Sequence, residues 1–492
     1  MSLDPLSSAL RRAVRACARP LLCGFALPLA LACATGAAWE QQAGEQAALD
    51  VEQGLGLVEG ELADYVASVG EALVERARPA GGPFHFHVAD MPEPNAFALP
   101  GGYVYVSRGM LAILNDEDEL AGVLGHEIGH VAGRHHLKTR RRAVTLLPLR
   151  LATSLSSAAV GLVSPRLGRL VGALGGAPSG LVLASHGRGQ EREADEIGQR
   201  LVATAGWDPA GLSRVMRTLS REQALYGEDP RRQSFFATHP TSPERQQVTT
   251  QRAATLTRAK RVGITRDRAD FLGRLEGLLV GASGAEGVFV GTRFLHPDLG
   301  LGVTFPEGWT LENSPDAVGG GDPDGTALVV LSLADAQDDA LEAAASDLAA
   351  LRVRVEKPPA PIELGGAPAA SAIFRDGDTR TLAYWVERSG LVFRILGVTR
   401  VASFEERRSE LERVARSFRR LDDAERREVT VARLRLFEGA PGESVEQIVA
   451  RAGSPWRPEQ AAVANGLRAS EPLAEARLVK LPVSEPYHRA AR

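Results

Sequence analysis

Hydrophobic and polar positions follow different periods in successive parts of this 492-residue chain. Between Asn115 and Lys138, apolar residues recur at intervals of three and four, which predicts a helix with one apolar face. The segment 196–274 is mostly helical by the same criterion, whereas short runs rich in β-branched and aromatic residues after position 293 predict strands. The sequence therefore predicts an α+β multidomain protein whose first large domain is mainly helical.

The charges at the two ends of helix 115–138 support this prediction. Asn115 is a favourable N-cap, and acidic residues follow it in the first turn, where the helix dipole favours negative charge. Basic residues gather at the other end, and a solvated helix terminus explains them. Because the net charge of the chain is −4, we do not expect nucleic acid as a partner.

Two histidines and a glutamate on this helix are the first candidates for chemistry. His126, Glu127 and His130 form the pattern HExxH. Residues four apart share a helix face, so both imidazoles can bind one metal ion while Glu127 stands beside an activated water as general base. The motif therefore predicts zinc-assisted hydrolysis of an amide bond.

A catalytic zinc takes three protein ligands, and the sequence offers two candidates for the third. His136 completes the spacing of the metzincin pattern. Glu191 lies in a second helical run, where Asp195 could hold the free nitrogen of a ligand histidine. We favour Glu191, because a metzincin needs a methionine-containing turn and Met216 lies in a helix-like run. His135 and His136 are then expected on the surface of a helix that continues past the motif.

Four ordered segments resemble one known family. They are HEIGH at 126–130, EREADEIG at 191–198, NAFALPGG at 95–102 followed by a strand-like run, and Thr238-His239-Pro240 with Arg245 beyond it. Together they resemble the HtpX and CAAX-prenyl-protease type of zinc metallopeptidase, and in particular its soluble periplasmic branch in Gram-negative bacteria. The resemblance implies a mainly helical, gluzincin-type peptidase domain with a small sheet, at residues 34–280.

The resemblance also implies the roles of the motif residues. One Zn²⁺ per chain would be bound by His126, His130 and Glu191. Glu127 would act as the base, and Asp195 would lie behind a ligand histidine. These assignments agree with the chemistry of the residues themselves.

Further residues are expected to act on the substrate or to control the site. His239 would lie near the metal as a removable fourth ligand that keeps the enzyme latent, with an ordinary loop histidine as the alternative. His239 and Arg245 are both candidates to stabilise the oxyanion of the reaction. The alternating run Tyr103, Val104 and Tyr105 is expected to be a half-exposed edge strand that pairs with an extended substrate, with a core strand as the alternative.

The N-terminal 33 residues are interpreted as an export signal. Arginines precede the apolar stretch 21–32, which is too short to span a membrane. All three cysteines lie in this segment, so a disulfide scaffold is excluded. Cys33 ends a stretch that resembles a bacterial lipoprotein cleavage box, and plain cleavage is the alternative. We expect a periplasmic protein, anchored to the outer membrane by lipid if Cys33 is modified. The apolar segment 144–185 is expected to be a helical hairpin over the cleft.

Two further units are predicted after a glycine-rich linker at 281–292. Residues 293–421 read as a small α+β domain without a catalytic constellation. Residues 429–484 resemble a LysM module in the order strand, two helices, strand, on Pro441-Gly442, Asn465-Gly466 and the apolar run 478–481. That resemblance implies peptidoglycan as a partner, and a plain packing domain is the alternative.

These observations predict a zinc endopeptidase for unfolded or misassembled envelope proteins, with outer-membrane assembly machinery as a further partner. The alternative is a zinc-stabilised chaperone or adaptor that binds outer-membrane proteins or peptidoglycan without significant proteolysis. The combination of Glu127, Glu191 and Asp195 favours the enzyme, because a structural zinc would not need Glu127.

Overall fold

The computed structural model describes residues 36–137, 186–226, 235–239, 242–260, 263–313, 317–334 and 339–488. The expected export signal with Cys33 and the expected hairpin at 144–185 lie outside these ranges. None of the helices described is both long enough and apolar enough to cross a bilayer.

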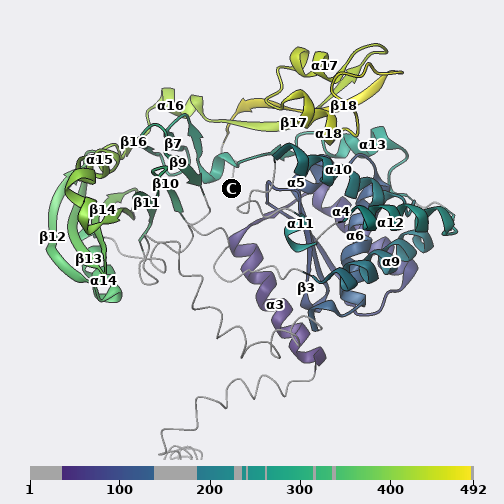
Figure 1. The fold of residues 1–492 in the computed structure, drawn as a ribbon, viewed down its shortest axis with the longest axis horizontal. Helices are drawn as coiled ribbons and strands as arrows, with labels where there is room; N and C mark the ends of the chain where they lie inside the picture. The colour runs from purple at the N-terminus through teal and green to yellow at the C-terminus, as the bar shows by residue number, and fades with distance from the viewer. Residues whose placement is uncertain are drawn as a thin grey trace, which may run out of the picture.

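The first unit packs helices around a small four-stranded sheet (Figure 1). The strand order is β1-β2-β4-β3, with β4 parallel to β2 and antiparallel to β3. The strands are β1 (Leu57–Val58), β2 (His85–Ala89), β3 (Ala96–Leu99) and β4 (Tyr103–Ser107). The helices are α3 (Gly36–Gly54), α4 (Glu61–Ala77), η1 (Pro100–Gly102), α5 (Arg108–Ile113), α6 (Glu117–Ala132), α9 (Arg188–Ala205), α10 (Gly211–Tyr226), α11 (Phe235–Thr238), α12 (Pro243–Thr255) and α13 (Arg268–Arg274).

The position of β4 contradicts the prediction of an edge strand at Tyr103–Ser107. β4 is hydrogen-bonded on both sides, and only Tyr103 is more than slightly exposed. Tyr105 is fully buried and stacks on Phe97 at 5.0 Å between ring centroids. Alternation of polar and apolar residues does not distinguish a phenol ring that faces solvent from one that fills a second small core. The edge strand on this side is β3.

The HExxH helix is shorter than predicted at both ends. Its N-cap is Asp116, whose side chain accepts from the backbone N–H of Glu119, whereas Asn115 is buried just before it. The helix ends at Ala132, and Arg134 adopts a left-handed conformation with φ of 51°. A new helical turn begins at His135. The expectation of one continuous helix was therefore wrong beyond Ala132.

Helices α6 and α9 approach each other closely through small residues. A Cβ on Gly129 would lie 2.6 Å from the backbone oxygen of Ala194, and a Cβ on Gly198 would lie 2.7 Å from that of Gly125. No larger residue fits at these crossings without separating the helices. The glycines that flank the motif histidines therefore allow α9 to bring its carboxylates against α6.

The middle unit contains two antiparallel sheets and cores of its own. The sheets have the orders β12-β13-β14-β15-β11-β10-β9 and β16-β8-β7-β6. Alternate residues of the larger sheet pack against α14 on one face and α15 on the other. The elements are η3 (Gly284–Glu286), β6 (Val288–Val290), β7 (Arg293–His296), β8 (Leu301–Thr304), β9 (Thr310–Asn313), β10 (Ala317–Gly321), β11 (Ala327–Leu333), α14 (Ala340–Leu351), β12 (Arg354–Leu364), β13 (Ala367–Asp376), β14 (Thr379–Arg388), β15 (Leu391–Arg400), η4 (Val401–Ser403), α15 (Phe404–Arg416), β16 (Arg419–Arg420) and α16 (Asp423–Glu428).

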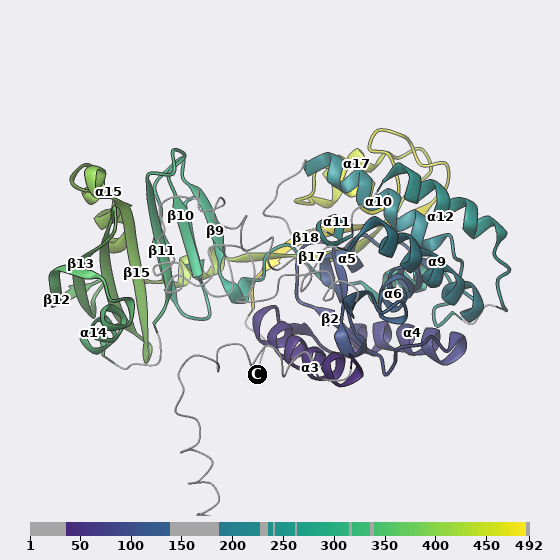
Figure 2. The same ribbon diagram turned by 60° about the horizontal axis from the view of Figure 1, so that its bottom comes forward.

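The C-terminal module has the predicted order of strand, helix, helix, strand. Its elements are β17 (Thr430–Gly439), α17 (Val445–Ala452), α18 (Pro458–Ala464) and β18 (Arg477–Pro486). It lies along the helical unit rather than apart from it, as Figures 1 and 2 both show. β17 pairs with β5 (Leu279–Val280), and Leu434 and Ala464 belong to the core of the helical unit. The predicted linker 281–292 is not free, because it contains η3 and β6.

Candidate metal centre

Four buried side chains from three elements meet beside β3. His126 and His130 come from α6, Glu191 from α9, and His239 directly follows α11. One ligand atom from each lies within 4.8 Å of the others. Nε2 of His126 is 3.1 Å from Nε2 of His130 and 3.3 Å from Nδ1 of His239, and Oε1 of Glu191 is 3.4 Å from Nε2 of His130. The structure therefore brings the three expected ligands and His239 together.

The chemistry of this group fits zinc. Zinc binds imidazole nitrogen and carboxylate oxygen, and three protein ligands leave one position for water. Burial, followed by the nearby histidines, holds the pKa of His130 well below its usual value, so the imidazole is in the neutral form that binds metal. Both carboxylate oxygens of Glu191 are buried, and no hydrogen bond of ordinary geometry reaches Oε1 among the described residues. Such an acceptor is rare in native proteins, and a zinc ion bound by this group would satisfy it.

Glu127 is the best-placed base. Its side chain is 1% exposed, and Oε1 lies 3.6 Å from Nε2 of His239. Burial raises its pKa, although His239, His126 and the nearby backbone of Ala98 act in the opposite direction. A glutamate with a raised pKa holds a proton better at neutral pH, as a general base must do after it has taken one from water.

Behind the ligands, a carboxylate and a guanidinium form a buried network. Oδ1 of Asp195 lies 3.0 Å from Nδ1 of His126. Arg245 donates from Nε and Nη2 to the two oxygens of Asp195 at 2.9 and 2.7 Å, and its Nη1 is 2.9 Å from Oε2 of Glu191. Burial disfavours the charged form of Asp195, but His126 and Arg245 outweigh it and lower its pKa to about 2.

This network changes the role expected for Arg245. Its nitrogens face the carboxylates of Glu191 and Asp195, and its side chain is only 4% exposed. A guanidinium held in this way orients the ligand and its partner rather than an oxyanion of the substrate. The interpretation of Arg245 as an oxyanion donor is therefore not supported by its position, whereas Asp195 lies where it was expected.

The histidines after the motif are not surface residues. His135 is fully buried, and His136 is half-buried and has a pKa lowered to about 4 by burial and by His135. The turn after Ala132 causes this difference, because the ring of His135 that follows it lies against His130, with their Nδ1 atoms 2.9 Å apart. His136 does not belong to the group of four ligands. His186, which no sequence signal singled out, lies over the ring of His130 with centroids 4.0 Å apart.

Contacts with neighbouring residues hold His239 against the other candidate metal ligands. Its ring stacks on Phe235 at 4.4 Å, and its backbone N–H donates to the carbonyl of Phe235. The preceding residue, Thr238, accepts a backbone hydrogen bond from His186. A side chain 1% exposed and in contact with two ligands is not an ordinary loop histidine.

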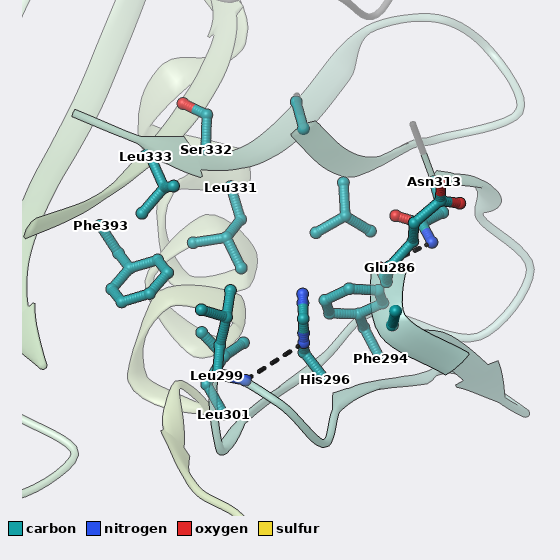
Figure 3. Close-up of a pocket in the computed structure, with 13 residues that line it drawn as sticks. Glu286, Phe294, His296, Leu299, Leu301, Asn313, Leu331, Ser332, Leu333 and Phe393 are labelled. Atoms are coloured by element: carbon teal, nitrogen blue, oxygen red, sulfur yellow. Dashed lines mark hydrogen bonds between the residues drawn. The ribbon is translucent and has the colours of Figure 1, made fainter. Parts of the chain in front are cut away.

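A hollow in the middle unit has a different character from the metal centre (Figure 3). It has a volume of about 190 Å³, and side chains such as Phe294, Leu331 and Phe393 make it mainly apolar. His296 borders it, and its Nδ1 accepts from the backbone N–H of Leu299 at 3.3 Å, as expected of a histidine that stabilises a turn. Among the described residues that line it, only one imidazole and one carboxylate could bind a metal ion, which is fewer than the four ligands that meet beside β3.

Comparison with known proteins agrees with the metal centre. Residues 61–253 match the sequence profile described as "Peptidase family M48". This match confirms the resemblance to zinc metallopeptidases that the ordered motifs indicated, and these peptidases depend on zinc. The matched range includes all four clustered ligands, Glu127 and Asp195.

Individual relatives match this chain over a similar number of residues. The "Beta-barrel assembly-enhancing protease" of Yersinia pestis is 33% identical over 186 residues, or 37% of each chain. "Metalloprotease YcaL" of Escherichia coli (strain K12) is 35% identical over 167 residues, which are 34% of this chain and 61% of the relative. "Mitochondrial metalloendopeptidase OMA1" of Schizosaccharomyces pombe is 33% identical over 183 residues, 37% and 50% respectively. The chain thus spans less than two thirds of each of these relatives, and the units after residue 253 lie outside the family match.

Proposed function

We propose that the chain, whose residues 61–253 form a peptidase family M48 domain, is a zinc endopeptidase that hydrolyses unfolded or misassembled polypeptides. The observation that carries this proposal is the buried group of His126, His130, Glu191 and His239 with Glu127 beside it. A metal kept only for structure would not need a buried, unpaired carboxylate at this place.

In the proposed reaction, the residues of this chain bind the metal, position the water and move its proton. A zinc ion held by His126, His130 and Glu191 would supply a Lewis acid that acidifies water and polarises the scissile carbonyl. Glu127 accepts the proton of the attacking water and passes it to the leaving amine. His239 would be a fourth ligand that makes room for water and substrate when it leaves, and its ring would then lie close enough to act as a donor to the oxyanion.

The strand that pairs with the substrate is β3 in this proposal. It forms an edge of the sheet, whereas β4 is paired on both sides. The backbone amide of Ala98 in β3 lies near the carboxylate of Glu127, so a peptide laid along this edge would pass the base. Recognition through backbone hydrogen bonds selects extended chains with little preference for their side chains, which suits unfolded substrates.

The cellular setting is proposed from the relatives and from the expected export signal. The relative from Yersinia pestis is named for assembly of β-barrels. By analogy, the substrates are envelope proteins in the periplasm, the partners include outer-membrane assembly machinery, and Cys33 carries a lipid anchor. The LysM-like module would bind peptidoglycan, which a pull-down of the full chain with purified sacculi would test.

A casein digest tests the proteolytic function. The purified protein should bind one zinc and cleave casein, and a chelator should stop the cleavage. Glu127→Gln should keep the zinc and lose about 10²–10⁴-fold in rate, because the base is removed while the ligands stay. His239→Ala should cleave faster than wild type if the fourth ligand restrains the enzyme.

The same digest separates the enzyme from the chaperone. If wild type and His239→Ala both hold zinc and leave casein intact, but prevent its aggregation, the chaperone interpretation replaces this proposal. Equal cleavage by wild type and Glu127→Gln would show that Glu127 is not the base.

A further inference from the structure

The two ligand histidines of α6 differ in what supports them. Nδ1 of His126 faces the buried carboxylate of Asp195. Nδ1 of His130 instead lies 2.9 Å from Nδ1 of His135, and Nε2 of His135 lies 3.2 Å from Oε2 of Glu193. We propose that His135 and Glu193 are positioning residues that fix the ring of His130 for metal binding. This inference rests on the proposed function, because it concerns the same metal centre.

The proton positions are consistent along this chain of groups. His130 turns Nε2 toward the other ligands, so the tautomer that binds metal through Nε2 carries its proton on Nδ1. That N–H donates to Nδ1 of His135, which is then an acceptor and carries its own proton on Nε2. The second N–H points at the carboxylate of Glu193. In this arrangement each N–H has an acceptor.

The chain around His135 is shaped to hold this ring. A Cβ on Gly133 would lie 2.6 Å from Nε2 of His135, so the glycine leaves the space that the ring occupies. Gln190 donates from Nε2 to the backbone oxygen of His135 at 3.2 Å, and its Oε1 accepts from the backbone of Gly187. Helix α9 thus holds His135 through Gln190 and Glu193 while supplying Glu191 to the metal group.

The arrangement makes the support of the two ligands unequal. Asp195 is 2% exposed and clamped by Arg245, whereas the side chain of Glu193 is 47% exposed. His130 therefore receives its support through a neutral ring from a carboxylate that water can reach, and a partner of that kind polarises the ligand less than a buried anion does. We expect the loss of His135 to weaken metal binding mainly by releasing the orientation of His130.

A second metal ion is the competing interpretation. His130, His135 and His186 also offer nitrogens within 4.8 Å of one another. An ion there would require His130 to bind metal through both ring nitrogens, and therefore to lose the proton that its hydrogen bond to His135 uses. The hydrogen-bonded arrangement needs no ionised imidazole, and for this reason we favour it.

Zinc affinity of the full-length protein, measured by competition with a chromophoric chelator, tests the proposal. His135→Leu replaces the imidazole by an apolar side chain of similar length, which cannot accept the hydrogen bond from His130. This variant should bind zinc about 10–100-fold more weakly. His135→Asn places an amide oxygen where Nδ1 stood and should restore most of the affinity. Glu193→Gln should weaken binding less than His135→Leu does. His136→Asn is the matched control, because it removes the neighbouring, half-buried imidazole outside this chain of groups, and it should bind zinc as wild type does.

The thermal midpoints of the metal-free proteins show whether a loss of affinity reflects misfolding. Weaker binding at an unchanged metal-free midpoint, with rescue by His135→Asn, supports the proposal. Wild-type affinity in His135→Leu overturns it, and so does a second zinc equivalent in wild type that His135→Leu lacks. If metal-free His135→Leu does not fold, Glu193→Gln and His135→Asn decide, and wild-type affinity in Glu193→Gln together with a loss in His135→Asn overturns it. A wild type that binds no zinc defeats the proposed function itself, and the wild-type titration alone shows this.

Discussion

The middle unit and the C-terminal module follow each other along the chain, but they are attached to the peptidase domain in different ways. The two main cores of the middle unit are drawn entirely from residues 289–418, and a small third cluster around Leu295 and Leu421 also includes Val429 and Tyr487 at the two ends of the C-terminal module. The C-terminal module places Leu434 and Ala464 in the core of the peptidase domain and extends β5 by strand pairing. In structural terms the middle unit is an insertion between β5 and β17. The order of segments in a sequence therefore does not say which of them share a core.

The largest expected effect is the difference between deleting the C-terminal module and deleting the middle unit. Removing residues 429–492 exposes the core around Leu434 and Ala464 and should abolish folding and zinc binding. Replacing 281–431 by Asn-Gly joins Val280 to Ala432, which are paired antiparallel, through a two-residue hairpin turn. That protein should fold, bind one zinc and cleave casein. Circular dichroism and metal analysis of both proteins would check this.

The reverse pattern would contradict the comparison. If the chain without residues 429–492 were folded and bound zinc, the module would be an appended domain. If the protein without 281–431 were unfolded, the middle unit would be part of the peptidase core.

A buried lysine sharpens the comparison at the level of one residue. Lys480 is fully buried, and its Nζ donates to the backbone oxygen of Leu114 and to Oδ1 of Asn115 just before α6. Burial lowers the pKa of this amine well below its usual value, and the nearby Glu119 acts in the opposite direction. Lys480→Met should lower the free energy of unfolding by about 3–5 kcal/mol, because it leaves two buried acceptors without their donor.

Urea unfolding at pH 7 measures this loss. Arg468→Met in the same module is the control, because the side chain is 76% exposed and its removal should cost less than about 0.5 kcal/mol. Equal stability of the two variants would show that Lys480 does not hold the module to the peptidase domain.

The metal centre was easier to predict than the attachment of the units. The spacing of His126, His130, Glu191 and Asp195 is local, and helix periodicity alone places each pair on one face. The burial of His135 depends on a turn at Gly133 and Arg134 that no proline or loop-forming cluster announces.

Core membership is harder still to predict. Leu434 and Leu481 lie in the same module but belong to different hydrophobic clusters. The apolar character of a residue predicts that it is buried, but not in which core. For the same reason the central position of β4 was not predicted. Alternation along a strand predicts which side chains share a face of the sheet, but not which strands lie next to it. The attachment of a unit depends on long-range packing that the local pattern does not contain.

Breaking a buried ion pair in the middle unit should destabilise that unit alone, whereas the loss of Lys480 should destabilise the peptidase domain. Asp347 of α14 accepts from Nε1 of Trp385 at 2.7 Å and from Nη1 of Arg394 at 2.9 Å. Asp347→Ala should destabilise the middle unit by about 3 kcal/mol, because both donors lose a buried acceptor. Zinc affinity and casein cleavage at 25 °C should stay at wild-type values, because the cores are separate.

Calorimetry with two transitions would measure the effect, and only the transition of the middle unit should move. Asp339→Ala removes just the N-cap of the same helix and should cost about 1 kcal/mol. A matching fall in zinc affinity for Asp347→Ala would mean that the two units unfold together.

The smallest expected effect is a pH dependence at the junction between the module and α6. Burial, followed by the charge of Asp116, raises the pKa of Glu119 to about 7, from 4.5 for an ordinary glutamate. Between these values the unfolded chain releases a proton that the folded protein keeps, so this group makes stability fall as pH rises from about 4.5 to about 7. Below that window both states are protonated, and above it both are ionised.

Glu119→Gln should remove this slope while its amide oxygen still accepts from the backbone N–H of Asn115. Urea unfolding at pH 5 and pH 7.5 measures the difference between wild type and variant, which should shift in favour of the variant at the higher pH. Glu471→Gln, at an exposed position of the module, should track wild type at both pH values. The protein lacking 281–431 should show the same slope as the full chain, because Glu119 and Lys480 both remain. A slope that vanished with the middle unit would place the origin of the pH dependence there and would weaken the distinction between an inserted unit and a module built into the peptidase core.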